Sequence, residues 1–135
     1  MRNARDSFLH YLADNLSFDV HALMADANSP ASSRLQLNTL NVDFLDISPS
    51  FGNATIRVVL DVLHDDENAA LDMIQGIWDL FKQAFYTPIL DYSDPAHPAT
   101  AAWLYWDQGQ TRFTRVATDR YCHYTCTLTL RYMQG

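Results

Sequence analysis

The first apolar pattern in the chain has the period of an α-helix. Within residues 3–16, apolar side chains repeat every four positions from Phe8 to Leu16 and so fall on one side of a short amphipathic helix. Residues 18–25 then alternate apolar and polar side chains, which predicts a strand. The segment 26–33 is small, polar and contains a proline, and we expect it to be a loop.

The strongest helical pattern follows His64 and the acidic run 65–67. Its apolar positions have three-four-three-four spacing and are Leu71, Ile74, Trp78, Phe81 and Phe85. This spacing predicts a helix of about 20 residues, roughly 30 Å long, that buries these five side chains as one stripe. Asp65 or Asp66 is expected to cap its first backbone N–H groups, and the helix must end before Pro88. The opposite face carries Asp72, Gln75, Asp79 and Lys82.

The remaining segments alternate with the two-residue period of β-strands. In the clearest run, 55–63, one face holds Ile56, Val58, Leu60 and Val62, and the other holds Thr55, Arg57, Val59 and Asp61. We expect this run to pair with residues 40–47 as a hairpin through a turn at 48–53, with a bulge or break near Asn38. After the long helix we expect a short strand at 89–90, a loop at 93–98, a strand at 101–106, a hairpin turn at 107–110, a strand at 111–118 and a final strand at 120–132.

These elements predict a single α+β domain over residues 1–135. Short connections favour a mainly antiparallel sheet, with one long amphipathic helix packed on it and a short N-terminal helix. The final strand would place on one face Cys122, Tyr124, Cys126, Leu128, Leu130 and Tyr132. Four residues of strand separate the two cysteines by about 13 Å, which is beyond disulfide reach, so we expect reduced core thiols.

The charge balance narrows the function classes. Fifteen Asp and one Glu stand against eight Arg and one Lys, for a net charge of −7. A protein that gains affinity by displacing counterions from phosphates needs basic clusters, so we expect no specific nucleic-acid binding. No stretch reaches the roughly 20 apolar residues that span a bilayer, so we expect no membrane association. The N-terminus enters an amphipathic pattern instead of a secretory signal, which favours synthesis in the cytoplasm.

Catalytic signatures are absent from the sequence. It has no phosphate-binding glycine loop, no G-x-S-x-G and no H-E-x-x-H motif, so we expect no catalytic, cofactor or metal site. His64 and Asp65 are typical of a metal-dependent hydrolase only if further ligands join them, and helix capping explains both residues more simply. His123 and Cys126 are three apart in a strand, so they face opposite sides and do not share an ion.

The order of elements resembles a known family. The hairpin strand TIRVVLDVLHDD, the helix ENAALDMIQGIWDLFKQAF and the closing strand YCHYTCTLTLRYM are similar to the tail-terminator and tail-completion proteins of long-tailed bacteriophages. The resemblance covers most of the chain and implies a structural subunit without catalytic residues. It implies a homo-hexameric ring at the head-proximal end of the tail in the virion. The ring would bind the tail-tube protein, stop its polymerisation and present a surface to a head-side connector or neck protein.

Two sets of residues are candidates for that role. We expect the aromatic residues Trp103, Tyr105 and Trp106 to lie at an oligomer or tube interface. The acidic residues Asp65, Asp66, Asp72 and Asp79 would line a channel through which DNA slides without binding, if the exposed helix face points inward.

Three other functions remain open from the sequence. The first is a neck or head-closure connector, which shares the fold and the physics of a terminator. The second is a small α+β module that binds a hydrophobic ligand between helix and sheet, through aromatic residues such as Trp78, Phe81, Phe85, Trp103 and Trp106. The third is a hydrolase that uses His64 and Asp65.

Overall fold

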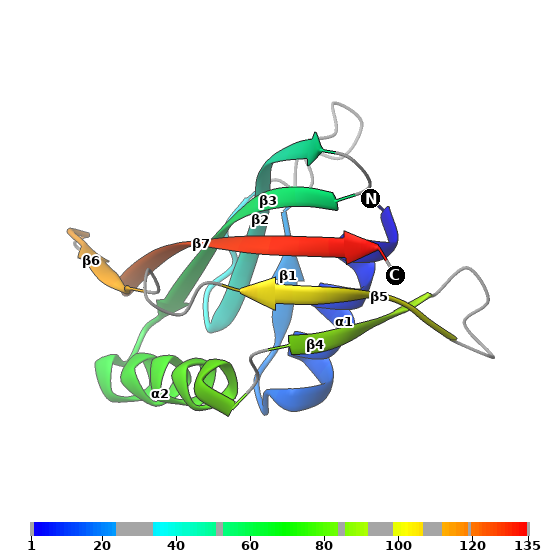
Figure 1. The fold of residues 1–135 in the computed structure, drawn as a ribbon. Coiled ribbons are helices and arrows are strands. Elements are labelled where there is room, and N and C mark those ends of the chain that lie inside the picture. The colour runs from blue at the N-terminus through cyan, green and yellow to red at the C-terminus, as the bar shows by residue number, and fades with distance from the viewer. Residues whose placement is uncertain are drawn as a thin grey trace.

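The computed structural model describes residues 2–23, 34–50, 53–83, 86–91, 99–106, 112–118 and 120–134. Side chains are described within these ranges except at residues 2–4, 50, 82–83, 86–91, 99–106 and 132–134. The two helices are α1 (Arg2–Asn15) and α2 (Glu67–Gln83). The strands are β1 (Val20–Ala22), β2 (Thr39–Ser50), β3 (Asn53–His64), β4 (Tyr86–Asp91), β5 (Ala99–Trp106), β6 (Thr114–Val116) and β7 (Cys122–Gln134). Figure 1 shows their arrangement.

The strands form one mixed, mostly antiparallel sheet. Its order is β1-β2-β3-β7-β5-β4, and β6 pairs with β7 beside this path. Strand β1 runs parallel to β2, whereas the other described pairings are antiparallel. The centre is the long pairing of β3 with β7, which runs from Asn53–Met133 to His64–Cys122. The α+β class and the two helices expected from the sequence are therefore confirmed.

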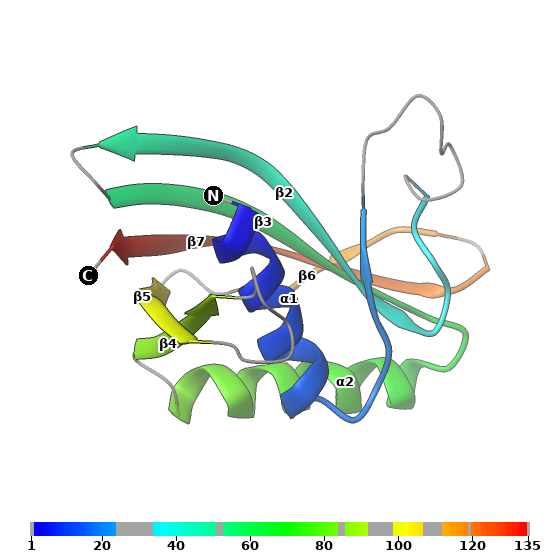
Figure 2. The same cartoon turned by 90° about the vertical axis from the view of Figure 1, so that its right-hand side faces the viewer.

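Both helices pack on the same face of the sheet (Figure 2). Between helices and sheet lies a core to which α1, β2, β3, α2 and β7 contribute buried side chains. Its largest fully buried members are Phe8, Phe81, Leu12, Leu40, Ile56, Leu60, Ile77, Leu128 and Leu130. The alternation predicted for residues 55–63 is confirmed, because Ile56, Val58, Leu60 and Val62 are all buried. Neither α1 nor α2 is long and apolar enough to cross a membrane, within the residues described.

The buried side of α2 differs from the predicted stripe. Its buried positions are Ala70, Met73, Ile77 and Phe81. Of the predicted stripe, Phe81 is buried as expected and Ile74 is partly buried against the core. Leu71 and Trp78, which were expected to face the sheet, are 47% and 53% exposed. Phe85 lies outside the described residues. One residue corresponds to about 100° of helix rotation, and α2 has apolar residues on two neighbouring sides. The apolar spacing alone therefore did not determine which side faces the sheet, and the packed side is rotated by one position.

The capping prediction for α2 is confirmed at Asp66. Its Oδ2 accepts a hydrogen bond from the backbone N–H of Ala69 at 3.2 Å, as the N-cap of a helix that begins at Glu67. Asp65 does not cap the helix. Its backbone N–H instead donates to Asn38 Oδ1 at 3.2 Å, and Asn38 has the positive φ of 62° that asparagine tolerates in a tight turn. The two junctions, before β2 and after β3, are thus joined.

Replacing Asp66 by Ala is expected to lower the free energy of unfolding by about 1 kcal/mol, because the Ala69 N–H loses its acceptor. Urea unfolding followed by circular dichroism measures this change. Asp65→Ala is the matched control, since it removes the same charge one residue away and leaves the cap intact. Equal effects of the two substitutions would show that charge, and not capping, stabilises the helix start.

The β2–β3 hairpin is longer than the sequence indicated. Residues 48–50 belong to β2, and Asn53 opens β3, so the predicted turn at 48–53 is wrong at both ends. Pro49 pairs with Ala54 in a strand that β1 flanks only from Leu40 to Val42. A proline is tolerated there because an outer strand has no second neighbour that requires its N–H. The break expected near Asn38 is confirmed, because Asn38 has a φ of 62° and β2 begins at Thr39. A bulge also lies between Phe44 and Asp46.

The predicted hairpin between residues 101–106 and 111–118 is wrong. Strand β5 pairs with β4 and β7, and β6, which covers only Thr114–Val116, pairs with β7. The turn expected at 107–110 lies outside the described residues. Strand β7 is 13 residues long, and it pairs with β5 through residues 130–134 and with β6 through residues 123–125. Two strands adjacent in sequence therefore share one long partner.

Other predicted segments are shortened, extended or not described. The strand expected at 18–25 is confined to Val20–Ala22, and the loop at 26–33 lies outside the described residues. The short strand at 89–90 extends over Tyr86–Asp91, and the loop at 93–98 is again outside the described part. Both cysteines are free thiols, as expected, and burial raises the pKa of Cys126.

Candidate interaction surfaces

Large apolar side chains are exposed at several places on the described surface. They are Leu35, Leu37, Leu45, Ile47, Leu71, Trp78, Val116 and Tyr121. Leu35 and Leu37 lie before β2, Leu45 and Ile47 lie in its outer half, and the others lie on α2 and around β6. Single exposed apolar residues are normal, but grouped ones beside charges indicate contact surfaces. Exposed charged residues lie beside these groups, among them the groups on α2 and around β6.

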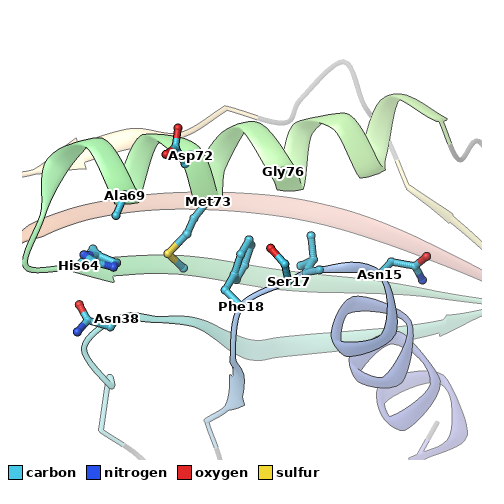
Figure 3. A pocket seen from close by; sticks show the side chains of 10 residues that line it. Asn15, Ser17, Phe18, Asn38, His64, Ala69, Asp72, Met73 and Gly76 are labelled. Carbon is cyan, nitrogen blue, oxygen red and sulfur yellow. The ribbon is translucent and has the colours of Figure 1, made fainter.

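The outward side of α2 combines apolar and acidic residues. Leu71 and Trp78 are seven residues, or about two turns, apart, so they lie along one side of the helix. Asp72 directly follows Leu71 in the sequence, and Asp79 directly follows Trp78. Gln75 Nε2 donates to Asp79 Oδ1 at 2.9 Å. Asp72 is exposed, and its carboxylate points away from Met73 and Phe18 (Figure 3). We call Leu71, Asp72, Gln75, Trp78 and Asp79 the α2 outer face.

The four acidic residues expected at a channel do not share one environment. Asp65 and Asp66 lie at the turn into α2, where Asp66 is already engaged as the N-cap. Asp72 and Asp79 lie along the α2 outer face, one and three turns further on. The structure therefore places two of them at the start of the helix and two on its side. That they face a channel stays a prediction.

A basic arm lies at the end of the sheet where α2 begins (Figure 1). The β6 arm, which we define as residues 112–118 with 120–121, carries exposed Arg112, Arg115 and Arg120. It also exposes Val116 and Tyr121. The sequence predicted a strand here but gave no reason to expect a surface. Three arginines within nine residues of a chain that has eight in all were the available signal.

Glu67 attaches the β6 arm to the first turn of α2. Its Oε1 lies 3.3 Å from Arg115 Nη1 and accepts a hydrogen bond from the Tyr124 hydroxyl at 3.1 Å. The pKa of Tyr124 is raised, first by desolvation and then by the hydrogen bond to Glu67. These contacts hold the arm beside the helix start. Arg112 and Arg120, the other two arginines of the arm, are exposed on either side of Arg115 in the sequence.

The face of the sheet away from the helices holds a polar pair that the sequence analysis did not find. His123 Nε2 lies 2.7 Å from Asp61 Oδ1, across β3 and β7, and both side chains are largely buried. Sequence analysis placed both residues on polar strand faces but considered His123 only with Cys126. The two faces of β7 are as expected, since Cys126 is buried in the core on the helix side.

We expect a double-mutant cycle on Asp61 and His123 to give a coupling free energy of about 1–2 kcal/mol. The hydrogen bond between them is mostly shielded from water. Each single Ala variant loses this bond and its contribution to the stability of the β3–β7 pairing. Chemical denaturation of the wild type, both single variants and the double variant supplies the cycle. The exposed pair Arg57 and Asp46 is the control and should give a smaller coupling. Additive single effects would mean that the pair contributes no specific interaction.

Arg57 and Asp46 join β3 to β2 just beyond the bulge. Arg57 Nε donates to Asp46 Oδ2 at 2.8 Å, and this hydrogen bond lowers the pKa of Asp46 and raises that of Arg57. Both side chains are exposed, so the interaction orients the outer half of the hairpin more than it stabilises the fold.

A hollow of about 380 Å³ lies between the end of α1 and the inner side of α2 (Figure 3). Phe18 and Met73 form its apolar part, and His64 and Asn38 lie at one end. Trp78 and Phe81, which the ligand-binding alternative required, are not among its lining residues. One is exposed on the α2 outer face, and the other is buried in the core.

His64 supports the helix start. Its Nδ1 accepts a hydrogen bond from the backbone N–H of Asp66 at 2.9 Å and lies 3.2 Å from Asp65 Oδ1. Within the described ranges, no three His, Cys, Asp or Glu side chains gather closely enough to hold a metal ion. His64 and Asp65 are thus adjacent, as the hydrolase hypothesis required, but the described residues bring no further ligand to them.

The aromatic candidates Trp103, Tyr105 and Trp106 lie in β5, between β4 and β7 in the sheet. Trp103 is opposite Pro88 on one side and Met133 on the other, and Trp106 is opposite Leu130. Their side chains lie outside the described part of the structure. Their role at an interface therefore stays a prediction.

Comparison with known proteins adds no identification. No protein-family model matches the sequence, and a search of curated proteins gives no significant match.

Proposed function

We propose that this chain is the subunit of a structural ring in the virion of a long-tailed bacteriophage, acting as a tail terminator. The ring caps the tail tube, stops its polymerisation and offers the surface to which the head-side connector binds. The observation that carries the proposal is the presence of two unlike contact surfaces on one small domain. One is acidic and apolar, on α2, and the other is basic and apolar, on the β6 arm.

Unlike surfaces favour head-to-tail assembly. A two-fold dimer joins the same patch on both subunits, whereas contact between two different patches generates either a closed ring or an open filament. A terminator needs the closed form, because a ring ends growth of the tube. Subunits are expected to join through side-chain contacts and not by pairing a strand of one copy with the sheet edge of the next. The outer strands disfavour such pairing, since β2 contains Pro49 and β4 contains Pro88. A proline in an outer strand has no N–H to offer a further strand.

The charge of the chain is consistent with a passage for DNA. A net charge of −7 repels phosphate, so a channel made from such subunits does not retain the genome. A basic wall would bind the DNA and would do so in a salt-dependent manner.

The decisive experiment is electron microscopy of virus particles assembled without this chain. We expect tails of irregular, excessive length that carry no heads, because nothing ends the growth of the tube. Tails of normal length that fail to join heads would contradict the terminator role and support a neck or head-closure connector. Complete, infectious particles would contradict both structural roles. His64→Ala provides a control within the chain, since a hydrolase would lose its function and a ring subunit would retain assembly.

A further inference from the structure

The α2 outer face and the β6 arm are complementary in charge and in apolar content. The α2 outer face presents Leu71 and Trp78 beside Asp72 and Asp79. Residues 112–121 contain three Arg and one Asp, and Val116 and Tyr121 are exposed among them. An apolar centre bordered by opposite charges on the two partners is the usual composition of a specific protein interface.

Within the described part of one chain, the β6 arm does not cover the apolar residues of the α2 outer face. Among the described residues, the β6 arm forms an ion pair with its own α2 at Glu67, through Arg115. Leu71 and Trp78 lie four and eleven residues further along the helix, which is about 6 and 16 Å at 1.5 Å per residue. Both remain about half exposed in the single chain. A second copy is therefore the partner whose arm has the matching chemistry.

We infer that the β6 arm of one copy packs on the α2 outer face of the next, and that this contact repeats around the assembly. Arg112 and Arg120 border the face on its acidic side, near Asp72. Val116 and Tyr121 cover Leu71 and Trp78. Because the arm and the face are different surfaces, each subunit uses one in each direction. The inference rests on the proposed function for its closed ring, but the pairwise contact is a separate claim.

Charge reversal gives a sharp test. In Asp72→Arg every contact opposes arginine to arginine, and in the double variant Arg112→Asp with Arg120→Asp every contact opposes aspartate to aspartate. Each variant alone is expected to need at least about tenfold more protein to associate than the wild type. In an alternating assembly of the two variants every contact again opposes arginine to aspartate, so an equal mixture should associate like the wild type. Sedimentation velocity at low salt measures the three samples.

Matched controls exclude trivial causes. Asp14→Arg changes charge by the same amount at an exposed position of α1 and should leave association unchanged. Far-ultraviolet circular dichroism of each variant reports whether the fold is retained. Association of both reversal variants at wild-type concentrations would overturn the inference. Failure of the mixture to recover while each variant remains folded would also overturn it.

A cross-linking experiment separates the contact from the ring. Leu71→Cys and Val116→Cys proteins are mixed, oxidised and analysed by mass spectrometry for a dimer that contains one of each. We expect that dimer, and we expect much less of it when Thr127→Cys, an exposed position of β7 outside the β6 arm, replaces Val116→Cys. Wild-type protein measures the background from Cys122 and Cys126. The specific dimer without closed rings in micrographs would retain the contact and refute the terminator proposal. Rings without the dimer would refute the contact alone.

Discussion

Ile77→Ala should lower the free energy of unfolding by about 2–5 kcal/mol, the usual range for removing a large apolar side chain from a packed core. Ile77 is fully buried in the middle of α2, in the same core as Leu60 and Leu128. Alanine is the better helix former, so local helix propensity opposes the loss. The whole effect must therefore come from lost packing against the sheet.

Leu71→Ala is the matched control, because it removes a side chain of the same size from the same helix. Leu71 is about half exposed, so its replacement should change the free energy of unfolding by less than about 1 kcal/mol. Urea unfolding compares the two variants directly, provided that the slope of the unfolding free energy against urea concentration is the same for both. If Leu71→Ala were the more destabilising, the helix would be rotated by one position from the structure described, and the α2 outer face would not exist.

This rotation marks the limit of what periodicity determines in α2. The presence of the helix, its acidic start and its end before Pro88 follow from capping chemistry and the sequence spacing, and all are found. Its phase does not follow, because both the line through Ala70 and Ile77 and the line through Leu71 and Trp78 are apolar. Contact with β3 and β7 selects the first line. A tertiary contact thus decides what a local pattern leaves open.

Strand neighbours show the same division. The alternation in residues 55–63 and 122–130 determines which side chains enter the core, and that prediction is confirmed. The pairing of β5 and β6 does not follow from alternation, since both find partners on β7 instead of each other. Asp61 and His123 come within 2.7 Å only because β3 and β7 are neighbours, although 62 residues separate them in the chain. No local pattern encodes that contact.

The candidate surfaces were predictable in part. Asp72 and Asp79 were assigned to the exposed side of the helix from the sequence, and they border the α2 outer face. Leu71 and Trp78 were assigned to the core, so the apolar half of that face was missed. The β6 arm was missed as a surface because its position beside the start of α2 depends on the contact between Glu67 and Arg115. Surfaces formed by distant segments become visible only when the chain is folded.

Asn41→Ala is expected to lower the free energy of unfolding by roughly 2–4 kcal/mol, since it removes several hydrogen bonds between a buried side chain and the backbone. Asn41 is fully buried. Its Oδ1 accepts from the Gln36 N–H at 2.8 Å, and its Nδ2 donates to the Gln36 carbonyl at 3.0 Å. The same Nδ2 also lies within hydrogen-bond distance of the Thr39 and Asp61 carbonyls.

Two measurements distinguish this role from simple loss of volume. Asn53→Ala, at the exposed start of β3, should change stability by less than about 0.5 kcal/mol, as surface substitutions usually do. Hydrogen exchange should show the Gln36 amide protected in the wild type and exposed in Asn41→Ala, because that amide loses its acceptor. An unchanged exchange rate at Gln36 would mean that Asn41 does not hold residues 34–38 against the sheet. The buried Asn41 side chain would then not determine the position of the residues that lead into β2.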